Sequence, residues 1–273
     1  MKDVSFGQYY PARSFVHKMD ARVKILLAIA YIVAVFLVKS EPEFYFLGFA
    51  ACFLFVVIAT VCSRVPFFKM LKSVKAIIFF VVFSAVLQLF FNKKGTPLWE
   101  GGFITDAGLY NAAFITARII LIVLGASLLT FTTSPVEIAD GLESLLTPLK
   151  FIKFPVHEFA LVMSIALRFI PTLLDETDRI IKAQKSRGAD FETGNVFKRV
   201  KALIPVLIPL LISSFRRADE LADAMDARCY SGSKKRTRYK KMKLGWRDLI
   251  GTLALAALIT GVVLLNGVLG IAV

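Results

Sequence analysis

Histidine and cysteine are scarce in this sequence, with two and three examples among 273 residues. The two histidines, His17 and His157, lie far apart in the sequence. The cysteines follow no zinc-binding spacing, and their odd number argues against a disulfide framework; they are Cys52, Cys62 and Cys229. No metal site and no cofactor are therefore expected.

Three catalytic sequence patterns are absent as well. The chain has no G-x-x-x-x-G-K-[ST] motif for nucleotide phosphates, no H-E-x-x-H zinc motif and no G-x-S-x-G nucleophile motif. The adjacent carboxylates Asp175 and Glu176 fall on the polar face of an expected helix, where a solvated surface explains them better than acid–base catalysis. The sequence thus predicts a chain that is not an enzyme and binds no ATP through a P-loop.

Charge is nearly missing from the long apolar stretches. Arg118 and Gln88 are the polar exceptions, whereas a self-contained ion-coupled carrier needs more polar groups at membrane depth. Two readings of Arg118 are open: the preferred one is that it snorkels towards the membrane interface, and the other is that it contacts a partner subunit.

Apolar residues are abundant, at 57% of the chain, and they gather into five blocks. A run of about 18 or more apolar residues can cross the hydrocarbon core as a helix. The sequence predicts an all-α polytopic protein of the plasma or inner membrane with about five transmembrane helices, near Val23–Val38, Phe44–Cys62, Val74–Phe91, Leu109–Phe131 and Leu249–Val273. The net charge of +14 is ordinary beside membrane spans. Contact with membrane lipid is therefore expected, and nucleic acid is not expected as a partner.

The distribution of Lys and Arg predicts the orientation, because cytoplasmic loops carry an excess of both. The segment before the first span and the loop after the second are rich in them, whereas the other two short loops hold Lys39 and the pair Lys93–Lys94. The N-terminus is therefore expected in the cytoplasm. Three regions follow: a membrane domain of four spans (1–131), a cytoplasmic helical region (132–245) and a last span (246–273).

Three helices are expected in the cytoplasmic region. The first begins at Ser134, which forms a capping box with Glu137 and has Pro135 at the first helical position. The second runs from about Val156 to Arg187 and the third from about Val196 to Arg228. Each of these two begins apolar, contains proline and becomes amphipathic.

Both long helices end in a small residue followed by arginine. The endings are Ser186-Arg187-Gly188 and Ala227-Arg228-Cys229. An arginine in a last turn can simply favour the helix dipole. The repeated ending favours an interaction role, since a guanidinium makes paired hydrogen bonds to carboxylates or carbonyls. A basic stretch, Lys234–Lys243, follows the second ending.

These motifs resemble, in order and over almost the whole chain, those of the transmembrane T component of energy-coupling factor (ECF) transporters, the EcfT family. The stretch 14–24 resembles Ser-x-x-His-x-x-Asp-Pro-Arg-x-Lys, with Ala21 in place of proline. The segments 133–149 and 168–188 resemble the family too.

The family signature is two Ala-Arg-Gly motifs at the ends of two long coupling helices. Arg187 and Arg228 match, whereas Ser186 and Cys229 depart. Cysteine in place of glycine makes a left-handed backbone at position 229 less expected.

The resemblance implies a coupling subunit of an ABC-type importer of vitamins or related micronutrients. Its partners would be two cytoplasmic ATPases and one membrane-embedded substrate-binding S component. Ser186, Arg187 and Gly188 would dock on one ATPase, and Ala227, Arg228 and Cys229 on the other. The tail 230–239 resembles that of vitamin-type members.

The resemblance also implies a surface for the S component on the coupling helices. Its candidate residues, which in the alternative only pack on each other, are Met163, Ile170, Leu173, Leu174, Phe215, Leu221 and Met225. Two other functions stay open: a membrane-embedded enzyme, and a stand-alone channel or carrier.

Overall fold

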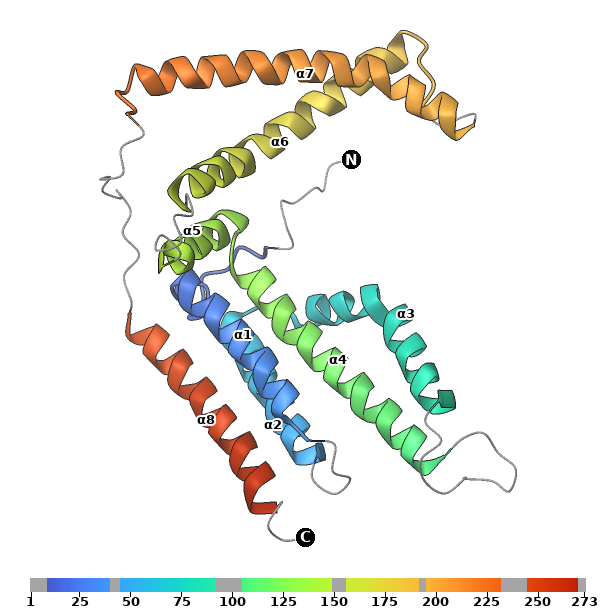
Figure 1. Ribbon diagram of the computed structural model, residues 1–273, viewed down its shortest axis with the longest axis vertical. Helices are drawn as coiled ribbons and strands as arrows, with labels where there is room; N and C mark the ends of the chain where they lie inside the picture. The colour runs from blue at the N-terminus through green and yellow to red at the C-terminus, as the bar shows by residue number, and fades with distance from the viewer. Residues whose placement is uncertain are drawn as a thin grey trace. The chain divides into compact units, whose positions relative to one another are not determined.

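The structure is a computed structural model that describes residues 9–39, 45–91, 105–148, 156–191, 195–231 and 245–269. The basic stretch Lys234–Lys243 lies outside these ranges. Within them the regular elements are eight helices (Figure 1): α1 (Ala21–Leu37), α2 (Tyr45–Ser63), α3 (Phe67–Phe91), α4 (Asp106–Thr132), α5 (Pro135–Leu146), α6 (Val156–Ser186), α7 (Val196–Asp226) and α8 (Trp246–Leu269).

The chain forms two compact units. Residues 1–157 and 242–273 form the first, which we call the membrane unit, and residues 158–241 form the second, the helix-pair unit. The membrane unit contains α1 to α5 and α8, and the helix-pair unit contains almost all of α6 together with α7.

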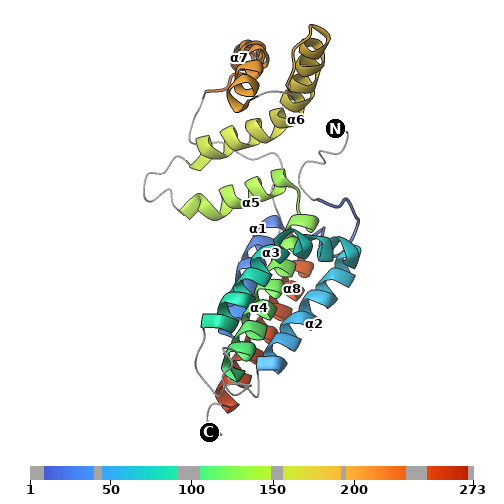
Figure 2. The same ribbon diagram turned by 90° about the vertical axis from the view of Figure 1, so that its right-hand side faces the viewer.

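In the membrane unit, α1 packs against α2, α4, α5 and α8, while α3 lies along α4 (Figures 1 and 2). Among the described residues, four helices are long and apolar enough to cross a membrane: α2, α3, α4 and α8. Four of the five predicted spans are thereby confirmed. Helix α3 begins at Phe67, before the predicted Val74, so that Lys69 and Lys72 are helical.

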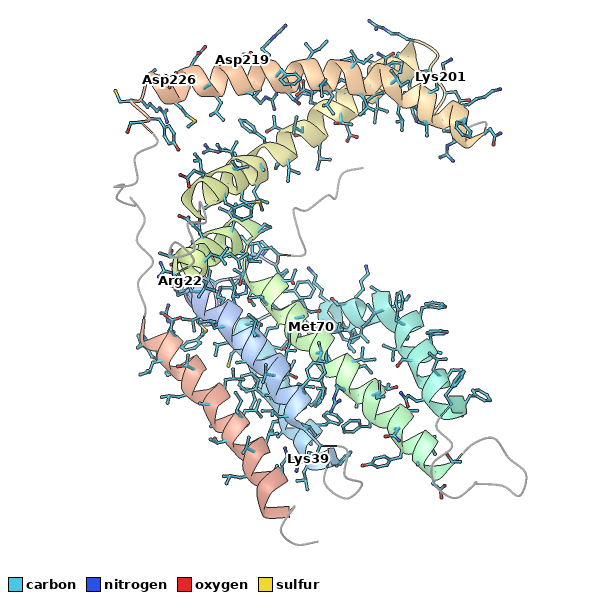
Figure 3. All side chains as sticks on the ribbon, viewed as in Figure 1. Arg22, Lys39, Met70, Lys201, Asp219 and Asp226 are labelled. Carbon is cyan, nitrogen blue, oxygen red and sulfur yellow. The ribbon has the colours of Figure 1, made fainter. Side chains whose placement is uncertain are left out.

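Helix α1 lies where the first span was predicted but is short. Its 17 residues cover about 25 Å, less than the roughly 30 Å of a hydrocarbon core. Charged residues bracket it, with Arg22 near its beginning and Lys39 just after its end (Figure 3). The helix therefore ends within the length that its neighbours span.

Two polar side chains satisfy the carbonyl groups at the end of α1. Arg118 Nη2 of α4 donates to the carbonyl of Val38 at 2.8 Å, and Asn266 Nδ2 of α8 donates to that of Leu37 at 2.7 Å. An unpaired carbonyl in lipid costs several kcal/mol, so the early end of α1 requires these donors. The preferred reading of Arg118 was wrong, because its guanidinium turns into the bundle instead of snorkelling.

The core of the membrane unit is apolar and shared among its helices. Buried residues include Tyr31 and Val35 of α1, Cys52 of α2, and Leu124 of α4. Gly125 faces the Tyr31 ring so closely that an added Cβ would lie 2.4 Å from it. Small residues of this kind allow membrane helices to approach each other.

Helix α3 exposes large apolar side chains, among them Phe79 (72%) and Phe91 (80%). Exposure on this scale is costly in water. Bulk lipid covers such a surface without cost, so the exposed apolar side chains of α3 agree with a membrane-spanning helix.

Candidate functional site

Helices α6 and α7 are the two long helices predicted for the cytoplasmic region. Both have 31 residues, and their predicted bounds are confirmed to within two residues. Pro171 lies inside α6, which bends along its length (Figure 2), and Pro205 and Pro209 lie inside α7. A proline removes one hydrogen bond from the helix and favours a bend.

The C-terminal end of α6 closes with a left-handed residue. Gly188 has φ +85°, and its N–H donates to the carbonyl of Lys185 at 3.0 Å. The next N–H, of Ala189, donates back to the carbonyl of Gln184 at 3.0 Å. This pair of bonds is the Schellman motif, which satisfies carbonyls that the helix end leaves free. The prediction of Gly188 as the stop is confirmed.

The end of α7 closes in the same way, although cysteine stands in the glycine position. Cys229 has φ +57°, and its N–H donates to Asp226 at 2.8 Å. The N–H of Tyr230 donates to Met225 at 3.0 Å. The backbone at Cys229 is therefore left-handed, although the departure from glycine made this conformation less expected here. The two hydrogen bonds hold a conformation that costs a residue with a Cβ about 1 kcal/mol.

Arg187 and Arg228 therefore occupy equivalent positions, each directly before the left-handed residue. Ser186, Arg187 and Gly188 are all exposed, and so are Ala227, Arg228 and Cys229. Neither guanidinium forms a hydrogen bond or an ion pair with any of the described residues. Figure 1 shows the C-terminal ends of α6 and α7 far apart within the helix-pair unit. The unit thus presents two separate, matching arginine ends.

A polar contact joins the middles of α6 and α7. Both oxygens of the Glu176 carboxylate accept hydrogen bonds, Oε1 from Ser213 Oγ and Oε2 from Arg217 Nη2 at 3.0 Å. The Arg217 guanidinium also lies 5.7 Å from the centre of the Phe169 ring. The interpretation of Glu176 as a merely solvated carboxylate was wrong, because its side chain is 24% exposed and paired across the two helices.

The apolar residues predicted to bind the S component come from both helices. Phe215 is 65% exposed and Leu174 42% exposed; Met163 and Ile170 are exposed, and Leu173, Leu221 and Met225 are half-buried. Among the described residues of the helix-pair unit, Val206 is the only buried hydrophobic side chain. The two helices therefore bury little of their apolar surface against each other.

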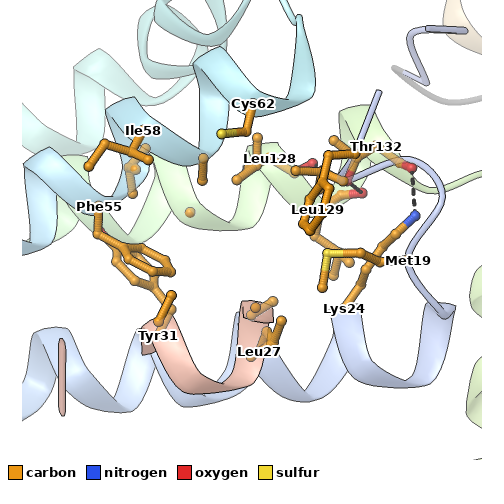
Figure 4. Close-up of a pocket in the computed structure, with 18 of the residues that line it drawn as sticks. Met19, Lys24, Leu27, Tyr31, Phe55, Ile58, Cys62, Leu128, Leu129 and Thr132 are labelled. Carbon is orange, nitrogen blue, oxygen red and sulfur yellow. Dashed lines mark hydrogen bonds between the residues drawn. The ribbon is translucent and has the colours of Figure 1, made fainter. Parts of the chain in front are cut away.

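The N-terminal motif is part of the membrane unit. His17 Nε2 donates to the carbonyl of Tyr10 at 2.9 Å, and Nδ1 lies 2.7 Å from Ser14 Oγ. Lys24, 5% exposed, donates from Nζ to the carbonyls of His17 and Thr132, each at 3.1 Å (Figure 4). These bonds join the N-terminal turn to α1 and to the end of α4.

Asp20 and Asp248 extend this network to α8. The Asp20 carboxylate accepts from the N–H of Arg22 at 3.0 Å, which caps the start of α1. The N–H of Asp20 donates to Asp248 Oδ1 at 2.9 Å, and Asp248 Oδ2 accepts from the N–H of Gly245 at 2.7 Å. Sequence reasoning missed this role, because the partners lie far apart along the chain.

The described residues offer little chemistry for a bound molecule. No group of three or more His, Cys, Asp or Glu side chains among them is placed to hold a metal ion. The membrane unit contains a cavity of about 420 Å³ between α1, α2, α4 and α8, with a lining that is almost wholly apolar (Figure 4). Lys24 is its charged lining residue, and two carbonyls already bind the ammonium.

Comparison with known proteins agrees with the resemblance noted in the sequence. The family model described as "Cobalt transport protein" matches residues 12–239. A protein of Ruminiclostridium cellulolyticum named "Energy-coupling factor transporter transmembrane protein EcfT" is 48% identical over 268 residues, which cover 97% of this chain and 98% of that protein.

Two further relatives carry the same name. The protein from Clostridium kluyveri is 48% identical over 262 residues, with 95% of each chain covered. The protein from Bacillus subtilis is 43% identical over 264 residues, which cover 95% of this chain and 98% of that protein. The chain therefore belongs to the EcfT family of energy-coupling factor transporter transmembrane proteins.

Proposed function

We propose that this chain is the coupling subunit of an ABC-type importer, and that it transmits ATP-driven motion from two cytoplasmic ATPases to a membrane-embedded S component. One observation carries the proposal: two long helices end in matching Schellman caps that each present an exposed arginine, whose guanidinium has no partner among the residues that the structure describes. Hydrolysis of ATP belongs to the partners, and the chain itself catalyses no reaction.

The two arginine ends suit two similar docking sites. A guanidinium offers five N–H donors in a rigid fork that matches carboxylates and carbonyls. Ser186 and Gly188 flank one arginine, and Ala227 and Cys229 flank the other. Small neighbours leave each fork accessible to a groove. Two equivalent ends on one chain fit a pair of related ATPase subunits, one arginine to each.

The exposed apolar residues of α6 and α7 are proposed to bind the S component. Phe215 and Leu174 belong to helices that also carry many charged side chains, such as Lys201, Asp219 and Asp226 of α7 (Figure 3). A helix that is apolar on one side and charged on the other binds best to a partner that covers only the apolar side. Met163, Ile170, Leu173, Leu221 and Met225 complete the proposed surface.

The proposal places the N-terminus and the region 132–245 on the cytoplasmic side of the cell membrane, where ATP is available. The excess of Lys and Arg in these segments supports that orientation. Residues 1–131 and 246–273 then provide the membrane domain. The S component selects the substrate, which the resemblance of the tail 230–239 suggests is a vitamin or a related micronutrient.

The docking proposal is tested by co-purification of the tagged chain with the ATPase pair of the same genome in mild detergent. Each docking arginine would become buried when the complex forms, so reversing its charge is expected to cost several kcal/mol of binding free energy. Arg187→Glu and Arg228→Glu should each weaken the complex, and the double variant should lose both ATPases.

The matched control is the double variant Arg179→Glu/Arg216→Glu, which reverses two exposed arginines on the same helices away from their ends. It should keep both ATPases. Equal losses in the two double variants would show a general charge effect and contradict docking through the helix ends. A wild-type chain that retains no ATPase would contradict the coupling function itself.

A further inference from the structure

The Glu176 contact fixes the relative position of α6 and α7 at one point. Ser213 and Arg217 lie one turn apart on the same face of α7, and they bind different oxygens of the same carboxylate. A shift of α7 along its axis by one residue would misplace both donors. The side chains of Glu176 and Arg217 are only 24% and 27% exposed, so water screens the pair weakly.

A second contact between the two helices is weaker. Gln184 Nε2 donates to the carbonyl of Pro205 at 3.4 Å, beyond the usual range for a hydrogen bond of this type. That carbonyl lacks the usual α-helical donor, since Pro209, four residues later, has no N–H. A single long bond between uncharged groups restricts the helices less than a paired carboxylate does.

We propose that Glu176, Ser213 and Arg217 form a fixed pivot about which α6 and α7 turn relative to each other. The inference rests on the proposed coupling function, and it locates the relative rotation of α6 and α7 at this contact. Beyond the contact, α6 continues for about 15 Å, from Glu176 to Ser186, and α7 continues for about 20 Å, from Ser213 to Asp226. Rotation at the contact therefore moves the arginine ends, while Glu176 stays paired with Ser213 and Arg217.

The three residues are positioning residues, because they belong neither to the proposed docking ends nor to the proposed surface for the S component. A pivot differs from two alternatives in its consequences. If the helices slide, residues beside the contact move as far as residues distant from it. If the contact only maintains a static fold, no distance in the helix pair depends on ATP.

Spin-label distances in the complete complex distinguish these cases. One label pair, at the exposed Arg179 and Arg216, lies beside the contact; the other, at the exposed Ser164 and Ala222, lies away from it along both helices. Each pair is introduced as cysteines in a chain whose exposed Cys62 and Cys229 are replaced by Ser and Gly. Because Cys229 belongs to a proposed docking end, this background is first shown to hold both ATPases and to hydrolyse ATP as the unmodified complex does. Distances are measured without nucleotide and with ATP and vanadate, which hold the ATPases closed.

A pivot predicts that the distant pair changes by about 5 Å, the size of a one-turn shift, while the near pair keeps its distance. Equal changes in both pairs would overturn the pivot in favour of sliding. No change in either pair, in a complex that holds both ATPases and hydrolyses ATP, would also overturn it. Failure of the wild-type chain to bind ATPases is a different result, because it removes the coupling function first.

A charge exchange tests the named residues directly. Arg217→Glu places two carboxylates together and should broaden the near-pair distance distribution about twofold. The double variant Glu176→Arg/Arg217→Glu restores opposite charges and should narrow it again. If the double variant is as broad as the single one although both proteins remain monodisperse, the ion pair does not fix the crossing.

Discussion

The membrane unit and the helix-pair unit are stabilised by different means. In the membrane unit, apolar residues from several helices share one buried cluster, and Lys24 and Asp248 pair with backbone groups of distant segments. In the helix-pair unit, polar contacts join α6 and α7, and most apolar side chains stay exposed. The apolar surface of the membrane unit suits a bilayer, whereas the described residues leave most apolar side chains of α6 and α7 uncovered, which the proposed protein partners would cover.

The largest expected effect of a single change is at Lys24, within the network of the membrane unit. Lys24→Ala leaves the buried carbonyls of His17 and Thr132 without their charged donor. We expect a loss of about 3 kcal/mol in the free energy of unfolding, measured in mixed detergent and SDS micelles. Lys182→Ala, an exposed lysine of α6, is the control and should change stability little. Similar losses of stability in both variants would contradict a special role of the Lys24 hydrogen bonds in the membrane unit.

A smaller loss is expected where α1 and α4 approach each other. In Gly125→Ala the new methyl group would lie 2.4 Å from the Tyr31 ring, so the helices must separate. Overpacking of this kind costs about 2 kcal/mol. Gly261→Ala on α8 meets no atom within 4 Å and should not lower the melting temperature. A stable Gly125→Ala variant would mean that the close contact is not required.

In the helix-pair unit, an apolar residue should affect binding rather than stability. Phe215→Ala removes a ring that is 65% exposed, so the melting temperature should stay the same. Binding of the S component should weaken about tenfold, as measured with purified proteins in detergent. Phe197→Ala, at a side chain 88% exposed near the start of α7, should leave that binding unchanged. If Phe197→Ala weakens binding more than Phe215→Ala does, the surface that binds the S component lies nearer the start of α7 than proposed.

The smallest effect is expected at the end of α7. Cys229→Gly removes the Cβ from a residue at φ +57° and should stabilise the helix end by about 1 kcal/mol. Ala227→Gly, at φ −61°, should destabilise it instead. Hydrogen exchange of the Tyr230 N–H reports both changes, with slower exchange in the first variant and faster exchange in the second. Faster exchange in Cys229→Gly would contradict the strain argument.

The sequence predicted most of the helices because their signals are local. The capping box of Ser134 and Glu137 is present, with Pro135 at the start of α5. The apolar blocks located α2, α4 and α8, and amphipathic periodicity with Gly188 located α6 and its end. These patterns are properties of neighbouring residues, so one sequence is enough to recognise them.

The errors arise from contacts between segments far apart in the chain. Arg118 looked like an isolated charge, because its acceptor, the carbonyl of Val38, lies on another helix. Glu176 looked solvated for the same reason, since its donors are on α7. At Cys229, residue preference alone pointed away from the left-handed conformation that the two cap bonds hold. The arginine ends themselves were predicted, but their exposure and identical caps required the structure.

The coupling role is tested most directly by asking whether this chain connects the other subunits. A tagged S component is purified in mild detergent from cells that produce the ATPase pair, with and without this chain, and recovered ATPase is measured. If the chain couples the other subunits, the ATPases co-purify with the S component only when the chain is present. Equal recovery without the chain, or no recovery with it, would contradict the coupling role.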